Sequence, residues 1–191
     1  MKNIPIQTTS SDFTDERDGQ KYRTVKIGGQ TWMAENFNYS ANDCAGAWNS
    51  IYGRLYDWVE AMTIAPEGWH LPSDVEWDEL ESFASQSQSK SKLHDGFIDS
   101  GSHLKAEGGW DFSDKIINRN TFGFSALPGG IIQDCGNEKT DFIGVEGYWW
   151  TSTEIERHEK AIYKKMDSRL NMTVWGAFSV RACMSVRLVK D

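Results

Sequence analysis

The stretch APEGWHLPSDVEWDELESF, residues 65–83, constrains the fold of this chain more than any other. Ser73 stands before an apolar periodic run and Glu76 follows three residues later, which is the capping-box pattern of a helix start. A serine cap of this kind contributes about 1 kcal/mol. Pro72 favours an extended residue before it, so an extended segment is predicted to lead directly into a helix over residues 74–85. The apolar face of that helix is expected to consist of Trp77, Leu80, Phe83 and Ala84.

Periodicity predicts further elements on both sides of this helix. Residues 22–27 alternate in polarity, Gly28-Gly29 supplies a turn, and residues 30–37 return, which together indicate a β-hairpin. Residues 54–62 carry apolar side chains at i, i+3, i+4 and i+7, a pattern typical of an amphipathic helix. Downstream, loop-forming residues dominate, and short strands are expected at residues 123–127, 147–152 and 161–166, and within residues 178–189.

The length of 191 residues is typical of one domain. Residues 1–19 are polar and are predicted to form a mobile tail, and residues 20–191 a single domain. Two early helices followed by a loop-rich β region indicate the α+β class.

The net charge of −8 argues against nucleic acid or an anionic membrane as the main partner. No apolar run reaches the roughly 18 residues of a membrane span, and the first ten residues lack the apolar segment of a signal peptide.

Cysteine and histidine give little indication of catalysis. Cys44, Cys135 and Cys183 are widely spaced, which excludes zinc-ribbon and CxxC motifs. Free thiols are favoured, and one disulfide with one remaining thiol is the alternative. His70 is interpreted as a structural residue that hydrogen-bonds near the helix start. The other histidines lie in polar segments and are expected to be solvated: His94, His103 and His158.

Metal and cofactor sites are not expected. Asp111, Asp114 and Asn118 offer oxygen ligands, but their spacing does not follow the EF-hand pattern, so a solvated acidic loop is favoured over a calcium site.

Aromatic side chains are the better candidates for ligand contact, because sugars and proteins both bind to exposed rings. Trp32, Trp58, Trp69 and Trp77 are expected in the core. Trp175 and Trp110 lie in polar surroundings and are expected to be more exposed. The predicted ligand-binding residues are Trp175, Asn171, Arg169, Trp110 and Trp150.

Six motifs, in order, resemble the Fibrobacter succinogenes major paralogous domain family: GQKYRTVKIGGQTWMAENF, GRLYDWVEA, PEGWHLPSDVEWDEL, GFSALPGG, GYWWTSTE and SVRLVKD. The resemblance spans residues 19–191 and implies a C-type lectin-like fold, which also includes domains similar to the formylglycine-generating enzyme. Relatives usually carry cysteines where this chain has Ala65 and Leu188. The resemblance therefore implies that this chain lacks a disulfide, and burial of Leu188 is expected to offset part of the loss.

The resemblance also implies a function. We expect a non-catalytic binding or display module at the bacterial cell surface or outside the cell, which recognises a glycan or a protein through the loops between Trp149 and Phe178, with help from Trp110. One alternative is an oxidase related to the formylglycine-generating enzyme. The other alternative is a structural adhesin unit without a ligand pocket. The oligomeric state is left open.

Overall fold

The computed structural model describes residues 10–40, 48–85, 96–111, 117–137 and 139–191. Strands dominate these residues and form a five-stranded and a six-stranded sheet. They are accompanied by three short helices: α1 Trp58–Thr63, α2 Asp74–Ala84 and α3 Ser100–Leu104. The predicted α+β, C-type lectin-like fold with two helices is therefore wrong, because the described residues are mostly β. Many strands have only two to five residues, too few for an alternating pattern to stand out.

The first sheet has the strand order β1-β2-β3-β11-β6, and its pairs are antiparallel. Val189 lies opposite both Trp32 and His70, so the last strand of the chain occupies an inner position in this sheet. The strands are β1 Ser10–Thr14, β2 Lys21–Ile27, β3 Gln30–Met33, β6 Trp69–His70 and β11 Val189–Lys190.

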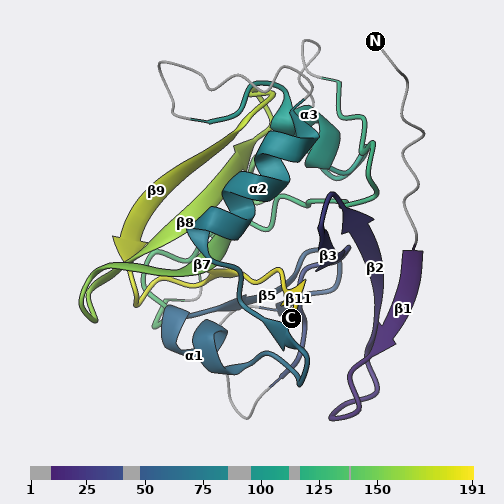
Figure 1. Ribbon diagram of the computed structural model, residues 1–191. Coiled ribbons are helices and arrows are strands. Elements are labelled where there is room, and N and C mark those ends of the chain that lie inside the picture. The colour runs from purple at the N-terminus through teal and green to yellow at the C-terminus, as the bar shows by residue number, and fades with distance from the viewer. Residues whose placement is uncertain (1–9, 41–47, 86–95, 112–116, 138) are drawn as a thin grey trace, which may run out of the picture.

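The second sheet has the order β4-β5-β10-β7-β8-β9. Its β10 pairs in parallel with β7, through Ser185 and Trp149, and antiparallel with β5. Figure 1 shows β7–β9 on one side of α2 and β1–β3 on the other. The strands are β4 Trp48–Asn49, β5 Gly53–Tyr56, β7 Glu146–Glu156, β8 Lys160–Asp167, β9 Thr173–Ser179 and β10 Met184–Ser185.

The tail predicted for residues 1–19 is wrong in its second half, whereas residues 1–9 lie outside the described residues. β1 pairs with β2 over its whole length. After it, Arg17 forms two side-chain hydrogen bonds with Asp15 and donates a third to the carbonyl of Ile64 at 2.9 Å. An edge strand exposes much of its surface, which explains why a polar segment belongs to the domain.

The predicted helix start at Ser73 is confirmed. The Ser73 hydroxyl accepts the backbone N–H of Glu76 at 3.3 Å, and the Glu76 carboxylate accepts the backbone N–H of Ser73 at 2.7 Å. The earlier helix begins four residues later than predicted, because Asp57 caps it and the preceding residues form β5. The expected apolar faces are only partly buried: Val59, Met62 and Phe83 are exposed.

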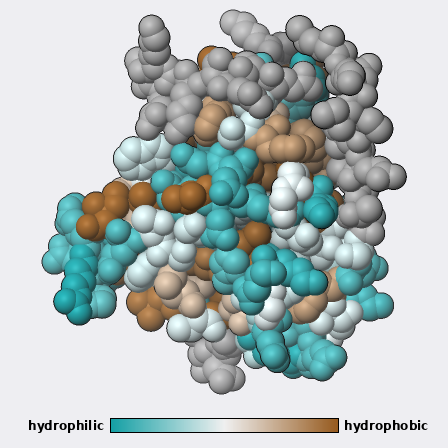
Figure 2. All heavy atoms as spheres, in the orientation of Figure 1, coloured by the Kyte–Doolittle hydropathy of each residue, from teal (hydrophilic) through white to brown (hydrophobic). Residues whose placement is uncertain are grey.

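The expected core tryptophans Trp32, Trp58, Trp69 and Trp77 are all buried. Trp58 and Trp69 belong to one apolar cluster, and Trp32 and Trp77 belong to another. Ala65 and Leu188 stand where relatives carry cysteines. Leu188 is buried, as expected, and Ala65 packs against the same apolar cluster. On the face drawn in Figure 2, hydrophobic side chains are exposed in separate groups among hydrophilic ones.

A buried polar group joins the two sheets at Asn36, which follows β3. The amide oxygen of Asn36 accepts from Trp149 Nε1 and from Arg187 Nη2, each at 2.9 Å. Its amide nitrogen donates to the carbonyl of Tyr52 at 2.8 Å and to the Ser185 hydroxyl at 3.3 Å. Burial lowers the pKa of Arg187 to about 9. This group holds Asn36, and with it the start of the segment after β3, against the second sheet.

Candidate functional site

The turn between β8 and β9, residues 168–172, contains two of the predicted ligand-binding residues. Arg169 donates from Nε and Nη2 to the Asp167 carboxylate at 2.9 and 2.7 Å. Burial raises the pKa of Asp167, but the hydrogen bonds from Arg169 outweigh it and lower that pKa to about 2. Asn171 donates to the Asp99 carboxylate at 2.5 Å. Both side chains therefore hold the turn in shape, and Arg169 still exposes 68% of its side chain.

Lys105 is hydrogen-bonded to the main chain of this turn. Its ammonium donates to the carbonyls of Asp167 and Leu170 at 3.0 and 2.7 Å. The same nitrogen lies 5.1 Å from the ring centroid of Trp110, a third predicted ligand-binding residue. Trp110 is partly buried and donates its indole N–H to the carbonyl of Ala126 at 3.0 Å. Burial lowers the pKa of Lys105 to about 8. The buried Lys105 ammonium thus contacts both the turn and the Trp110 ring.

Residues 141–145 form a loop between Trp110 and the turn. The N–H of Asp111 donates to the carbonyl of Gly144 at 2.6 Å, and the N–H of Ser168 donates to the carbonyl of Val145 at 2.9 Å. At its tip, Phe142 is 50% exposed and Ile143 is 42% exposed. We call this surface the loop face and define it by five residues: Trp110, Phe142, Ile143, Arg169 and Asn171.

The two other predicted ligand-binding residues lie elsewhere. Trp175 is 44% exposed on β9. Trp150 is completely buried and donates its indole N–H to the carbonyl of Tyr56 at 2.9 Å. The prediction of Trp150 as a ligand-binding residue is therefore wrong, because β7 lies inside the second sheet and its first six residues are all buried. For the same reason its neighbours Tyr148 and Trp149 are also buried.

The histidines divide into three kinds. His70 lies between two carboxylates, with Nε2 2.7 Å from Glu76 and Nδ1 2.6 Å from Asp191, as expected of a structural residue at the helix start. His103 was expected to be solvated, but it is buried in α3 and its Nδ1 lies 2.6 Å from the Thr121 hydroxyl. His158 is exposed, as predicted, and His94 lies outside the described residues.

Cys135 and Cys183 are joined by a disulfide. The favoured prediction of free thiols is therefore wrong for these two residues, and the alternative of one disulfide is correct. The bond links residues 48 positions apart, with a Cα–Cα distance of 5.3 Å. Cys44 and Asp114 lie outside the described residues.

Among the residues that are described, no group of three or more His, Cys, Asp or Glu side chains is arranged to hold a metal ion. In the same residues, no helix is long and apolar enough to cross a membrane.

The family model described as the Fibrobacter succinogenes major domain matches residues 25–190. The chain belongs to this family. No curated protein and no solved structure matches it. In this family member, three of the six motifs that carried the resemblance meet at Asn36. Asn36 comes from GQKYRTVKIGGQTWMAENF, Trp149 from GYWWTSTE and Arg187 from SVRLVKD. These motif residues build the scaffold, whereas the loop face lies outside the Asn36 group.

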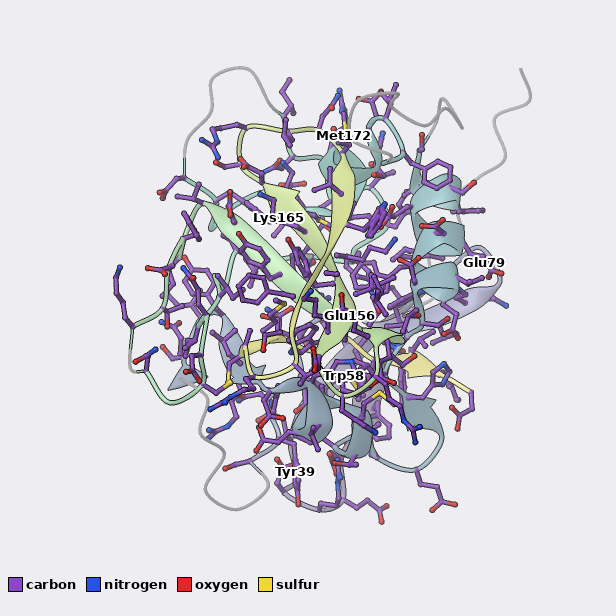
Figure 3. The ribbon with its side chains drawn as sticks, turned by 90° about the vertical axis from the view of Figure 1, so that its left-hand side faces the viewer. Tyr39, Trp58, Glu79, Glu156, Lys165 and Met172 are labelled. Atoms are coloured by element: carbon purple, nitrogen blue, oxygen red, sulfur yellow. A yellow bond between two sulfur atoms is a disulfide. The ribbon has the colours of Figure 1, made fainter. Side chains whose placement is uncertain are left out.

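A concave surface elsewhere on the molecule was not predicted from the sequence. It is a polar cleft of about 210 Å³ beside the β4–β5 turn. Its lining comes from four separated segments, so no local motif marks it. Figure 3 shows Met172, at the end of the β8–β9 turn, at the opposite end of the molecule from Tyr39, which follows the cleft residue Asn38. The residues that line the cleft include Gln20, Lys21, Asn36, Asn38, Asn49 and Tyr52.

Proposed function

We propose that this domain is a non-catalytic recognition module that binds a protein partner through the loop face. The observation that carries the proposal is the exposed pair Phe142 and Ile143 at the tip of the 141–145 loop. Phe142 has a left-handed backbone with φ 62°, and its carbonyl accepts the N–H groups of Val145 and Glu146 at 3.0 and 2.9 Å. A bulky residue is uncommon in that conformation, and such strain is often found at functional sites.

The composition of the loop face supports a protein over a glycan. Aromatic residues and arginine are enriched at protein interfaces, and a few such residues carry most of the binding energy. Trp110, Phe142 and Arg169 are residues of these kinds. Because Lys105 and Asp167 hold the turn by hydrogen bonds, binding requires little ordering of the main chain, which favours affinity.

The cell surface is the location that we propose for this module. The Cys135–Cys183 disulfide supports it, since disulfides persist mainly in oxidising compartments. A glycan ligand remains a second candidate because the polar cleft offers a different kind of site.

The proposal is tested by photo-crosslinking from the loop face. A photoreactive amino acid replaces Ile143, and the full chain is incubated with proteins released from the bacterial surface. A crosslinked partner should appear with this protein and fall at least tenfold when Phe142→Gly is added, because glycine keeps the left-handed turn but removes the ring. Val75→Ala is the matched control, since Val75 is 67% exposed on α2 and lies outside the loop face.

Two results would contradict the proposal. One is a partner captured equally by the wild-type face and by the Phe142→Gly protein. The other is oxidation of a cysteine-containing peptide by the purified protein that is lost in Cys135→Ser or Cys183→Ser, which would favour the related oxidase.

A further inference from the structure

A hollow of about 530 Å³ lies between the end of β1 and the loop that precedes β6. One wall is formed by residues 13–17 and the other by residues 66 and 67. We call this hollow the acidic notch. It is defined by the residues that line it: Phe13, Thr14, Asp15, Glu16, Arg17, Pro66 and Glu67.

Two contacts hold the walls of the acidic notch together. Arg17 Nη2, on the first wall, donates to the carbonyl of Ile64, two residues before the second wall, at 2.9 Å. The ring of Phe13 packs against Trp69 of β6, with 5.2 Å between the ring centroids. The notch is therefore formed before any ligand arrives, which lowers the cost of binding.

The acidic notch presents two carboxylates to solvent. Glu16 and Glu67 are exposed, one on each wall, and neither side chain forms a hydrogen bond or an ion pair with another residue in the described part of the chain. Asp15 differs, because it accepts two hydrogen bonds from Arg17 at 2.9 and 2.7 Å, so their charges offset each other. The lining therefore keeps a net charge of −2, which attracts a cation.

Apolar surface accompanies these carboxylates. Phe13 is only partly buried, so its ring is available within the notch beside Pro66. Lysine and arginine side chains combine an apolar stem with a charged head, and aromatic rings attract such heads. A basic side chain thus matches both the charge and the apolar wall of this hollow, whereas an anion would be repelled by the two glutamates.

From this lining we propose that the acidic notch binds a basic side chain, lysine or arginine, of a partner polypeptide. The charged head lies between Glu16 and Glu67, and the stem packs against Phe13. Arg17 lies 3.9 Å from the ring centroid of Tyr39, and Figure 3 shows Tyr39 at the opposite end of the molecule from Met172 in the β8–β9 turn. The notch is therefore separate from the loop face, and this proposal does not depend on binding there.

The test titrates the full chain with three peptides, acetyl-Gly-Gly-X-Gly-Gly-amide, in which X is lysine, arginine or the uncharged norleucine. Amide NMR signals of residues 13–17 and of Glu67 report on the notch. The lysine or the arginine peptide should shift these signals, with an affinity at least tenfold higher than that of the norleucine peptide. Glu16→Gln and Glu67→Gln should each weaken binding by about 1.5- to 5-fold, the effect of one exposed ion pair.

Glu107→Gln is the matched control, since it makes the same change of charge at an exposed residue outside the notch and should bind as wild type does. Thermal melting should be alike for the three glutamine variants, because none of these carboxylates forms a bond within the described residues. Three results would overturn the proposal: no shift at the notch with the lysine and arginine peptides, equal binding of the norleucine peptide, or binding by Glu16→Gln and Glu67→Gln as tight as by Glu107→Gln.

Discussion

Trp149 and Arg187 donate hydrogen bonds to the same atom, Oδ1 of Asn36, and both distances are 2.9 Å. Trp149 belongs to β7 of the second sheet, and Arg187 lies between β10 and β11. Arg187 is completely buried, and its other hydrogen bonds go to main-chain carbonyls, including those of Met33 and Phe124 at 3.1 and 2.6 Å. One amide oxygen therefore joins the sheets and lies against a buried positive charge.

Asn36→Ala should be strongly destabilising, because it leaves an indole N–H and a guanidinium without their acceptor. Each such loss costs about 1–3 kcal/mol, so we expect the free energy of unfolding to fall by about 2–5 kcal/mol. Asn36→Asp keeps the acceptor and should lose less. Urea denaturation measures both variants, and an Asn36→Ala protein within about 0.5 kcal/mol of wild type, a change usual for surface substitutions, would contradict the assigned role.

The contact of His70 with Glu76 and Asp191 should make stability depend on pH. Burial lowers the pKa of His70, but hydrogen bonds with the two carboxylates outweigh this effect and raise it above 6.5. The folded state therefore holds the proton more tightly than the unfolded chain. The resulting stabilisation is fully present below about pH 6.5 and is lost as the pH rises through the higher folded-state pKa.

His70→Gln should remove this pH dependence at a cost of at most about 1 kcal/mol, since the group is partly exposed. Unfolding free energies from pH 5 to 8 measure the difference between wild type and variant, which should shrink as the pH rises. His158→Gln is the matched control, because His158 is exposed and its ring lies 3.7 Å from a single described carboxylate, that of Glu154. A difference that stays constant with pH would show that the carboxylates do not hold the proton.

Lys105 should have the opposite effect at alkaline pH. Burial lowers its pKa from 10.5 to about 8, so the unfolded chain binds the proton more tightly than the folded protein. Stability should therefore rise with pH between about 8 and 10.5, by an amount on the order of 2 kcal/mol. Lys105→Met cannot titrate and should lack this rise. Urea denaturation across that pH range measures the free energy of unfolding of both proteins. If it changes with pH in the same way in wild type and Lys105→Met, the prediction is contradicted.

The Cys135–Cys183 disulfide should contribute strongly to stability. Closing a loop of about 48 residues is worth about 4 kcal/mol in the chain-entropy model. The double variant Cys135→Ser/Cys183→Ser should lose roughly that amount, and dithiothreitol should destabilise wild type but not the variant. Intact mass before and after reduction and alkylation identifies the pair. Cys44→Ser serves as the control and should retain the response to dithiothreitol.

The features that were predictable from the sequence are those that depend on residues close together in the chain. The capping box at Ser73 depends on positions three apart, so it was visible and correct. The core tryptophans were expected because they lie within the family motifs, and all four are buried. The fold class failed because the sheets are assembled from strands such as β10 and β11, each of two residues, whose pairing depends on distant partners.

The candidate site was predictable only in part, for a related reason. Arg169, Asn171 and Trp110 are brought together by Lys105, but their hydrogen bonds to Asp167, Asp99 and Ala126 could not be inferred from spacing. Trp150 was misassigned because an aromatic residue in a strand gives no indication of which strands flank it. The polar cleft was missed because its lining is drawn from separated turns, where each asparagine alone is ordinary.

The inner positions of β10 and β11 have a consequence for how the chain folds during synthesis. In the sheets, β10 lies between β5 and β7, and β11 lies between β3 and β6. All of these neighbours except β7 precede their partner by more than a hundred residues. Neither sheet is complete until residues 184–190 have left the ribosome. Since contacts so distant in sequence form slowly, the domain is expected to fold late and as one unit, with its unpaired strand edges exposed in the meantime.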